Sequence, residues 1–484
     1  MRETVLIAIV WYGVVIQTFA QMTSPSSWPD MPLIDIVTVD SVMPVCDVAN
    51  PPSGCSGITI TNNEYVPGRM VMTYSSDTIY DSGEYVKGTS GMRIRIRGNS
   101  TGANLAQHPY KLKLSKKFDL MQRGPEKHKS KEWVLLSMYT WHPYLPGAET
   151  NTLTPFGLEL SRYVGMTWEP EAQFVNVVLN GDYQGLYYLV ESVQKGEAKV
   201  PVCDSGFLIE NDAFWWNEDG VYFKTDHQYA GMGYTYKYPD KDDVNDSISA
   251  AICGWMNQME EALWNQDGVE RFVDYDSFAR WIVAHDMLGT GDVRGSNMFL
   301  YRLDDNDDTR LMMGSLWDFD SSFRCEEDAW SPKHTSEVFY YPQLFKIPEF
   351  ASLYSSIYEQ VRPSVMQHMT DYCQRFETTY SEAFEESMNL HRTLYPGEGR
   401  NSLHNQLTVL LQKLESRLQH LDVMVGELVD VSLVSSAKSD NANTVCVRSV
   451  SGLSIRYSSF SPSGVYIHRL ADGKHVKVIS HGRM

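Results

Sequence analysis

The chain has 484 residues, of which 43% are hydrophobic and 12% aromatic, so it can bury the core of one large domain and a smaller unit beside it. Its 41 lysine and arginine residues against 61 aspartate and glutamate residues give a formal net charge of −20. A field of that sign repels nucleic-acid backbones and anionic lipid, which argues against a nucleic-acid partner or a peripheral-membrane role.

The first twenty residues are predicted to be an export signal. Arg2 supplies a short positive end, residues 5–16 are apolar but too few to span a bilayer, and Ala20 precedes the expected cleavage point. No later run approaches about eighteen apolar residues, so no transmembrane segment is expected in the mature chain. The alternative is an uncleaved anchor. Either reading predicts a secreted or cell-surface protein.

The segment from residue 32 to 115 is predicted to form strands, because apolar residues alternate with polar ones or run together between Pro, Asn and Gly. The strands expected in this part of the chain are 33–39, 69–75, 92–98, 108–115 and 132–138. A helix over 153–164 and a hairpin over 174–193 follow. The turn of the hairpin, Asn180-Gly181, suits the positive φ that a two-residue hairpin turn requires.

Helical spacing of apolar residues begins near residue 241. The helices expected there are 247–264, 276–289, 348–391 and 401–427. A hairpin of 298–303 and 310–317 encloses an acidic turn, interpreted as solvated because it lacks the Gly and Glu of a calcium-binding loop. The expected organisation is a signal at 1–20, a large α+β domain at 21–430, a linker at 431–442 and a small β tail at 443–484.

Seven cysteines leave one unpaired in an exported chain. Cys46 and Cys55 flank a loop rich in Pro, Gly and Ser, and the spacing allows a short disulfide bridge. The other five are scattered, and most of them are expected to be buried thiols.

The most informative motif is acidic. Asp292 and Asn297 are five positions apart and are followed, one hairpin later, by Asp318 and Asp320. In a protein-kinase site one such Asp accepts the substrate hydroxyl proton, while the Asn and the second Asp hold magnesium on the nucleotide phosphates. The alternative is that so acidic a chain places carboxylates around a turn by chance.

The basic groups of such a site are harder to assign, because the chain has no Gly-rich G-x-G-x-x-G loop. Lys111 and Lys113 on an alternating strand are the candidates for binding phosphate, with Glu191 as a possible partner. An ordinary pair of solvent-facing lysines is the alternative. Arg97 precedes a Gly98-Asn99 turn that can present backbone N–H groups and a guanidinium to phosphate, or can simply end a hairpin.

Further stretches occur in a characteristic order along the chain: RIRGNST (95–101), PYKLKL (109–114), EWVLLSMY (132–139), VNVVLNGDYQGLYYLVESV (175–193), GFLIEND (206–212), DVRGSNMFLYR (292–302) and LWDFD (316–320). Together this series resembles the CotH kinase family. The resemblance covers roughly residues 33–425. The ordered set is much more specific than any one of its members.

The resemblance implies an α+β, atypical protein-kinase-like fold with a β-rich N-terminal lobe and a helical C-terminal lobe. It implies transfer of the ATP γ-phosphate to Ser or Thr hydroxyls of a protein substrate, with Mg²⁺ or Mn²⁺. Asp292 resembles the catalytic aspartate of the family, and Asn297 and Asp318 resemble its metal ligands. Asp320 belongs to the same motif.

The chain departs from the family pattern in two places. Where members usually carry a Lys, it has Gln107-His108-Pro109, and the Arg-Asn pair expected before the helix at 153–164 is absent. Both changes remove groups that handle phosphate. A second hypothesis is therefore a non-catalytic surface pseudokinase or adhesin-like protein, which binds a surface protein partner on the same scaffold.

The last forty or so residues resemble the small β-sandwich sorting tail of proteins exported by the type IX system, through the segments VCVRSVSG and SGVYIHRLADGKHVKVI. That resemblance implies a host of the Bacteroidetes type and delivery to the outer-membrane surface or the medium.

Overall fold

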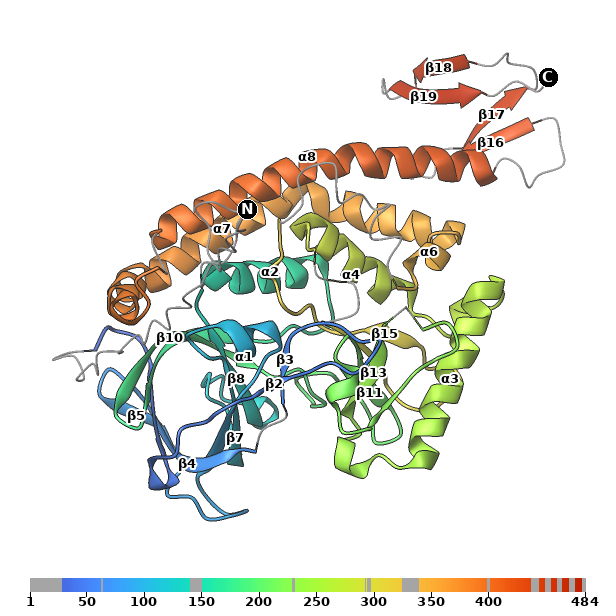
Figure 1. Ribbon diagram of the computed structural model, residues 1–484. Helices are drawn as coiled ribbons and strands as arrows, with labels where there is room; N and C mark the ends of the chain where they lie inside the picture. The colour runs from blue at the N-terminus through green and yellow to red at the C-terminus, as the bar shows by residue number, and fades with distance from the viewer. Residues whose placement is uncertain are drawn as a thin grey trace, which may run out of the picture.

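The structure is a computed structural model that describes residues 28–61, 64–139, 150–228, 231–291, 293, 297–323, 339–397 and 401–436, together with four strands nearer the C-terminus. The chain is a mixed α+β protein, as expected. Strands dominate its first half, and long helices follow (Figure 1).

The larger of two main sheets closes on itself. Its strands, in spatial order, are β1 (Leu33–Thr38), β9 (Ala172–Leu179), β10 (Asp182–Glu191), β8 (Ser130–Ser137), β7 (Tyr110–Phe118), β6 (Met92–Ile96), β4 (Val66–Tyr74) and β5 (Asp77–Asp81). Because β1 pairs in parallel with β9 and antiparallel with β4, every strand except β5 belongs to the ring. Two short strands, β2 (Val48–Ala49) and β3 (Thr59–Ile60), pair with each other separately.

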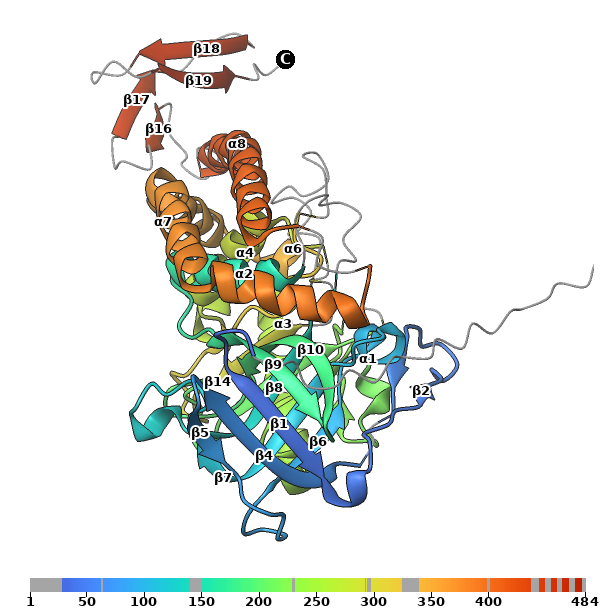
Figure 2. The same ribbon diagram turned by 90° about the vertical axis from the view of Figure 1, so that its left-hand side faces the viewer.

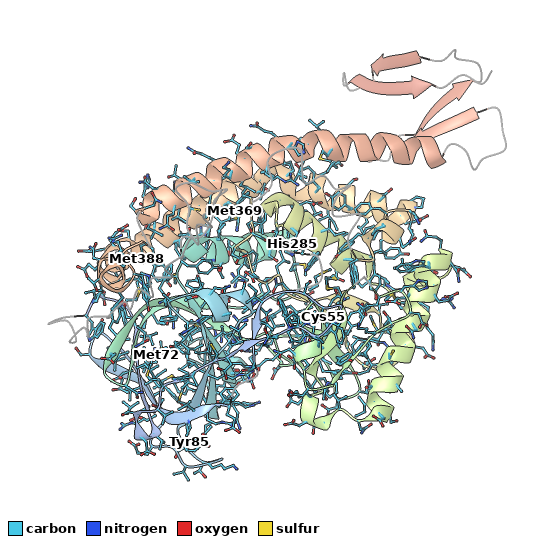
Figure 3. All side chains as sticks on the ribbon, viewed as in Figure 1. Cys55, Met72, Tyr85, His285, Met369 and Met388 are labelled. Carbon is cyan, nitrogen blue, oxygen red and sulfur yellow. The ribbon has the colours of Figure 1, made fainter. Side chains whose placement is uncertain are left out.

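The interior of the closed sheet is apolar because its strands alternate. On β7 the side chains of Leu112 and Leu114 are buried, whereas Lys111 and Lys113 lie on the other face. Met72 belongs to the same apolar cluster and lies within the closed sheet in Figure 3. The alternating pattern at 108–115 therefore predicted both the strand and its inward face.

The hairpin of β9 and β10 has the expected turn. Asn180 at φ 53° and Gly181 at φ 85° both adopt the left-handed conformation, which suits the twist of a two-residue hairpin. The Asn180 side chain also accepts a hydrogen bond from the backbone N–H of Thr38 at 2.9 Å. This turn is therefore fastened to the end of β1.

A second sheet follows the first along the chain. Its strands, in spatial order, are β12 (Tyr222–Phe223), β13 (Gly233–Tyr238), β11 (Phe207–Asp212), β14 (Met298–Arg302) and β15 (Leu311–Met313). The hairpin expected around the acidic turn is present as β14 and β15. Its second strand ends earlier than residue 317, because after Gly314 the chain leaves the ladder and runs toward the closed sheet and α2.

Helices α2 (Thr150–Val164), α4 (Tyr275–Leu288), α7 (Pro348–Leu394) and α8 (Leu403–Ser436) pack over one end of the sheets (Figures 1 and 2). Helix α3 (Asp246–Asn265) runs along the side of the second sheet in Figure 1, and the short helices are α1 (Ser100–Asn104) and α6 (Tyr341–Leu344). The largest apolar cluster joins α2, α4, α7 and α8 and includes Met369 and Met388 (Figure 3). No helix in the described ranges combines the length and the apolar character needed to cross a bilayer.

Two helices begin after an Asn or Asp side chain that caps the helix N-terminus. Asn245 accepts from the N–H of Ile248 at the start of α3, and Asp274 accepts from that of Ser277 at the start of α4. Gly289, at φ 56°, ends α4 in the left-handed conformation. At the other end of the chain, α8 continues to Ser436, past the expected helix end at residue 427.

The C-terminal segment contains four described strands that pair as two hairpins. They are β16 (Thr444–Arg448) with β17 (Ser454–Ser458), and β18 (Gly464–Arg469) with β19 (His475–Ser480).

The short disulfide bridge that the spacing of Cys46 and Cys55 allows is not formed, because both thiols are free. The Cys46 thiol instead donates to the carbonyl of Gly102 in α1 at 3.6 Å. Of the five scattered cysteines, the structure describes three side chains: Cys373 is buried as expected, whereas Cys253 is half-buried and Cys203 is exposed.

Candidate functional site

A pocket of about 60 Å³ lies where the closed sheet, α2 and the segment after β15 meet. Its lining residues are Arg97, Thr101, Pro109, Leu136, Ser137, Tyr139, Thr154, Leu158, Trp317, Asp318, Phe319 and Asp320. Ligand pockets for whole cofactors have volumes of roughly 300–1,000 Å³. A pocket of this size instead accommodates an ion with a few ligands, or one end of a larger molecule.

Two of the expected metal ligands share an unusual backbone conformation. Asn297 has φ 65° and Asp318 has φ 61°, in the left-handed region that Asn and Asp tolerate better than most residues. Such conformations cost about 1–3 kcal/mol each and concentrate at functional sites. Asp318 and Asp320 both line the pocket, and their role as metal ligands stays a prediction.

Asn297 is held by a carboxylate from the second sheet. Its backbone N–H donates to Oε1 of Glu210 on β11 at 3.2 Å, and Oε2 of Glu210 pairs with Nζ of Lys237 on β13 at 2.7 Å. Burial lowers the pKa of Lys237, but Glu210 and the neighbouring carboxylates raise it by more, so the ammonium group stays charged. Burial, followed by the charge of Glu210, raises the pKa of Asp212 to about 7.

Arg97 is influenced by two carboxylates from different parts of the chain, Glu210 and Asp318. Burial lowers the pKa of its guanidinium, and the carboxylates of Asp318 and Glu210 partly offset this. Its Cζ lies 5.9 Å from the ring centroid of Trp317. The arginine that follows β6 is therefore close enough to both Glu210 and the expected metal ligand Asp318 to feel their charge, and its guanidinium suits a phosphate bound beside a cation.

Asp292, the expected catalytic base, lies outside the described residues. The residue before it is placed: the N–H of Gly291 donates to the carbonyl of Ser321 at 3.2 Å. Gly291 therefore lies beside the segment that carries Asp320.

Lys111 and Lys113 share one carboxylate, and it is not Glu191. Their ammonium groups lie 2.7 and 3.0 Å from Glu132 on β8. Burial opposes ionisation, but the two lysines lower the pKa of Glu132 to about 2. In strand register Lys111 is paired with Arg95, which places both lysines on the outer face of the closed sheet, the face that carries Arg95 and Arg97.

The expected partnership of Glu191 with either lysine is wrong. Glu191 pairs in register with the buried Trp133, on the inward face, and forms ion pairs with Arg123 at 2.9 Å and Lys199 at 3.5 Å. The strand period of two separates it from Lys111 and Lys113. Glu191 therefore belongs to a buried ion-pair network away from the pocket.

Tyr139 was not anticipated as a site residue. Its hydroxyl donates to Oδ2 of Asp320 at 2.6 Å, across the junction between β8 and the segment after β15. Burial, then the charges of Asp320 and Asp318, raise the pKa of Tyr139 well above its usual value, so it remains a donor. Tyr139 lies in the stretch EWVLLSMY and Glu210 in GFLIEND, so membership of these motifs was the sequence signal that could have identified both residues.

Replacement of Tyr139 by Phe is expected to lower the free energy of unfolding by about 1.5 kcal/mol, the lower end for a hydrogen bond to a charged group, because this bond is only partly buried. Denaturant unfolding measures the change. The control is Tyr238→Phe, which removes an exposed hydrogen bond to the carbonyl of Asp204 and should change stability by no more than about 0.5 kcal/mol. Equal effects of both changes would contradict a structural role for the Tyr139–Asp320 bond.

The donor set suits a hard divalent cation. Asp318 and Asp320 line the pocket and offer carboxylate oxygen atoms, which Mg²⁺ and Mn²⁺ prefer, whereas Asn297 is not among the lining residues. Within the described ranges, no three His, Cys, Asp or Glu side chains gather closely enough to hold a metal by themselves. Mg²⁺ is usually bound through one or two carboxylates plus substrate phosphates and water, so this arrangement fits a cation that arrives with a nucleotide.

Comparison with known protein families gives one match. The model of the family described as CotH kinase protein matches residues 94–421, more than half of the chain, and this range contains Arg97, Asn297, Asp318 and Asp320. No curated protein matches the chain.

Proposed function

The chain belongs to the CotH kinase family, and from this premise we propose that it transfers the γ-phosphate of ATP to Ser or Thr hydroxyls of a protein substrate, with Mg²⁺ or Mn²⁺. The observation that carries the proposal is the pocket in which Asp318 and Asp320 lie with Arg97. Carboxylates for a cation and a guanidinium for phosphate are the two chemistries that phosphoryl transfer requires from a protein.

Each residue has a defined task in this proposal. Asn297, Asp318 and Asp320 would hold the cation, which would supply positive charge next to the nucleotide phosphates. Arg97 binds phosphate oxygen from the closed sheet. Asp292 accepts the proton of the attacking hydroxyl. Lys111 and Lys113 extend the positive face outward from Arg97, although Glu132 already neutralises part of their charge.

A protein-kinase-like architecture is part of the proposal. It is supported by the order along the chain of α4, Asp292, the hairpin β14–β15 and Asp318, because protein kinases likewise carry the catalytic Asp before the metal-binding Asp. The closed sheet supplies the basic side of the site in place of a Gly-rich loop.

Export is also proposed. The apolar run at 5–16 supports a signal peptide, and the tail motifs support a type IX sorting function in a bacterium of the Bacteroidetes type. The protein would then act at the cell surface or in the medium, where its substrate or partner is another surface protein.

The full chain is expected to transfer ³²P from γ-labelled ATP to protein hydroxyls in the presence of Mn²⁺ or Mg²⁺. Asp292→Ala should reduce transfer at least about 10²-fold, in line with the usual contribution of a general base. Scintillation counting of the protein band, on the chain itself and on a panel of surface proteins, measures it. The proposal of catalysis fails if the wild type labels nothing, or if Asp292→Ala labels as well as the wild type does.

One observation favours a non-catalytic alternative. Gln107 stands in the stretch Gln107-His108-Pro109, where the family usually carries a Lys, and its buried amide is occupied: Nε2 donates to the carbonyl of Leu186 at 2.8 Å, and Oε1 accepts from the N–H of Met138 at 2.6 Å. This side chain bridges β10 and the end of β8 and has no group left for phosphate. A pseudokinase that binds nucleotide or a surface protein without turnover is therefore the second candidate.

A further inference from the structure

One face of α2 contacts the segment that carries the expected metal ligands. Thr154, Gly157, Leu158 and Ser161 follow the spacing of one helix face. Thr154 and Leu158 line the pocket together with Trp317, Asp318, Phe319 and Asp320. Ser161 lies about one helical turn after Leu158 and contacts the segment indirectly, through Glu169.

The opposite side of α2 is anchored to the long helices. Thr152 Oγ1 donates to Oε1 of Gln406 on α8 at 3.0 Å, and the Tyr372 hydroxyl on α7 donates to the carbonyl of Pro155 at 3.2 Å. These bonds keep α2 in place relative to the helical part of the protein. A residue that bonds to α2 is thereby fixed relative to α7 and α8 as well.

Glu169 is the link between Ser161 and the site segment. Its Oε1 accepts a hydrogen bond from the Ser161 hydroxyl and another from the backbone N–H of Leu316 at 3.1 Å. Leu316 stands two residues before Asp318. The carboxyl group is 4% exposed, and its Oε2 is buried without a hydrogen-bond partner.

We propose that Glu169 is a positioning residue, whose carboxyl oxygen ties Ser161 of α2 to the backbone of Leu316 and so holds Asp318 in the conformation that binds the cation. The inference rests on the proposed function, because it takes Asp318 as a cation ligand. The backbone of Asp318 is in the left-handed region, where nearby contacts are needed to keep a non-glycine residue. The Leu316 bond is such a contact.

The group acts as a neutral acceptor. Burial raises the pKa of Glu169 to about 8, against the opposing effect of its two hydrogen bonds, so the proton is retained at neutral pH. Gln has the same length and keeps a carbonyl oxygen in the place of Oε1. Glu169→Gln should therefore preserve the tie, whereas Glu169→Ala removes it.

Two variants and one control test the proposal in the full chain. Hydrogen exchange of amides 314–321 measures local opening, and a titration with Mn²⁺ in the presence of ATP measures cation affinity. Glu169→Ala should exchange about tenfold faster in this segment and bind Mn²⁺ at least about tenfold more weakly, the usual cost of losing a group that orients a metal ligand. Glu169→Gln should match the wild type in both.

Leu263→Ala, in the buried core of α3, is the control for general destabilisation. It should lower the melting temperature without a selective effect on amides 314–321 or on Mn²⁺ affinity. The proposal is overturned if Glu169→Ala behaves like this control, or if Glu169→Gln is as damaged as Glu169→Ala. If the wild type does not bind Mn²⁺ and ATP, the proposed function fails and the exchange result alone decides the positioning role.

Discussion

Asp318→Ala and Asp318→Asn are expected to abolish the rise in melting temperature that ATP with Mn²⁺ gives the wild-type chain. A ligand that binds only the folded state stabilises it by about 2.7 kcal/mol at roughly 100 times its Kd. Asp318 lines the pocket beside Arg97, and without its negative charge the cation has no firm ligand on this segment. Differential scanning fluorimetry with ATP, with Mn²⁺ and with both measures the effect.

The two substitutions separate charge from backbone strain. Asp318 has φ 61°, where Ala is strained but Asn is tolerated, so Asp318→Asn should keep the stability of the unliganded protein and still lose the shift. Asp219→Ala, which removes an exposed carboxylate paired with Lys241 at 2.9 Å, is the control and should retain the shift. A full shift in Asp318→Asn would place the cation elsewhere. A wild type without any shift would favour a binding protein that uses no nucleotide.

Gly157→Ala is expected to destabilise the protein by about 1–2 kcal/mol and to weaken the same ligand shift. In a helix interior Gly to Ala normally gains about 0.5–1 kcal/mol. A Cβ at Gly157 would lie 2.2 Å from Cδ1 of Phe319, however, and overpacking of a core typically costs about 1–3 kcal/mol, which outweighs that gain. Phe319 stands between Asp318 and Asp320, so its displacement moves both carboxylates.

Gly254 provides a matched comparison. It lies inside α3, and a Cβ there meets nothing within 4 Å, so Gly254→Ala should stabilise the protein by about 0.5–1 kcal/mol and leave the ligand shift unchanged. Chemical denaturation of both variants measures the difference. Stabilisation by Gly157→Ala would mean that the ring of Phe319 moves aside freely, and that α2 does not constrain the segment.

Local patterns predicted the elements well because local physics determines them. The alternation at 108–115 and the Asn180-Gly181 turn each depend on a few neighbouring residues, and β7 and the β9–β10 hairpin are present where those patterns predicted them. The ordered motifs likewise identified Asp318 and Asp320, which share the pocket with Arg97.

Local patterns did not predict contacts between residues that are far apart in the sequence. The choice of Glu132 rather than Glu191 as the partner of Lys111 depends on strand register across β7, β8 and β10. Glu169 lies between predicted elements, and its value to the site depends on Leu316, 147 positions later. Pairings of this kind follow from tertiary packing, which a single sequence does not encode in any local spacing.

Closure of the larger sheet has a consequence for how the protein is made. The backbone N–H of Thr38 bonds to Asn180, 142 residues further on, so β1 has no partner on that side until the hairpin of β9 and β10 has been synthesised. At about 5–20 residues per second, that interval lasts roughly 7–30 s. During it the apolar strand LIDIVT has an open edge, which is the kind of surface that invites aggregation or a chaperone. This edge of β1 is therefore covered only once β9 is available to pair with it, however stable the finished sheet is.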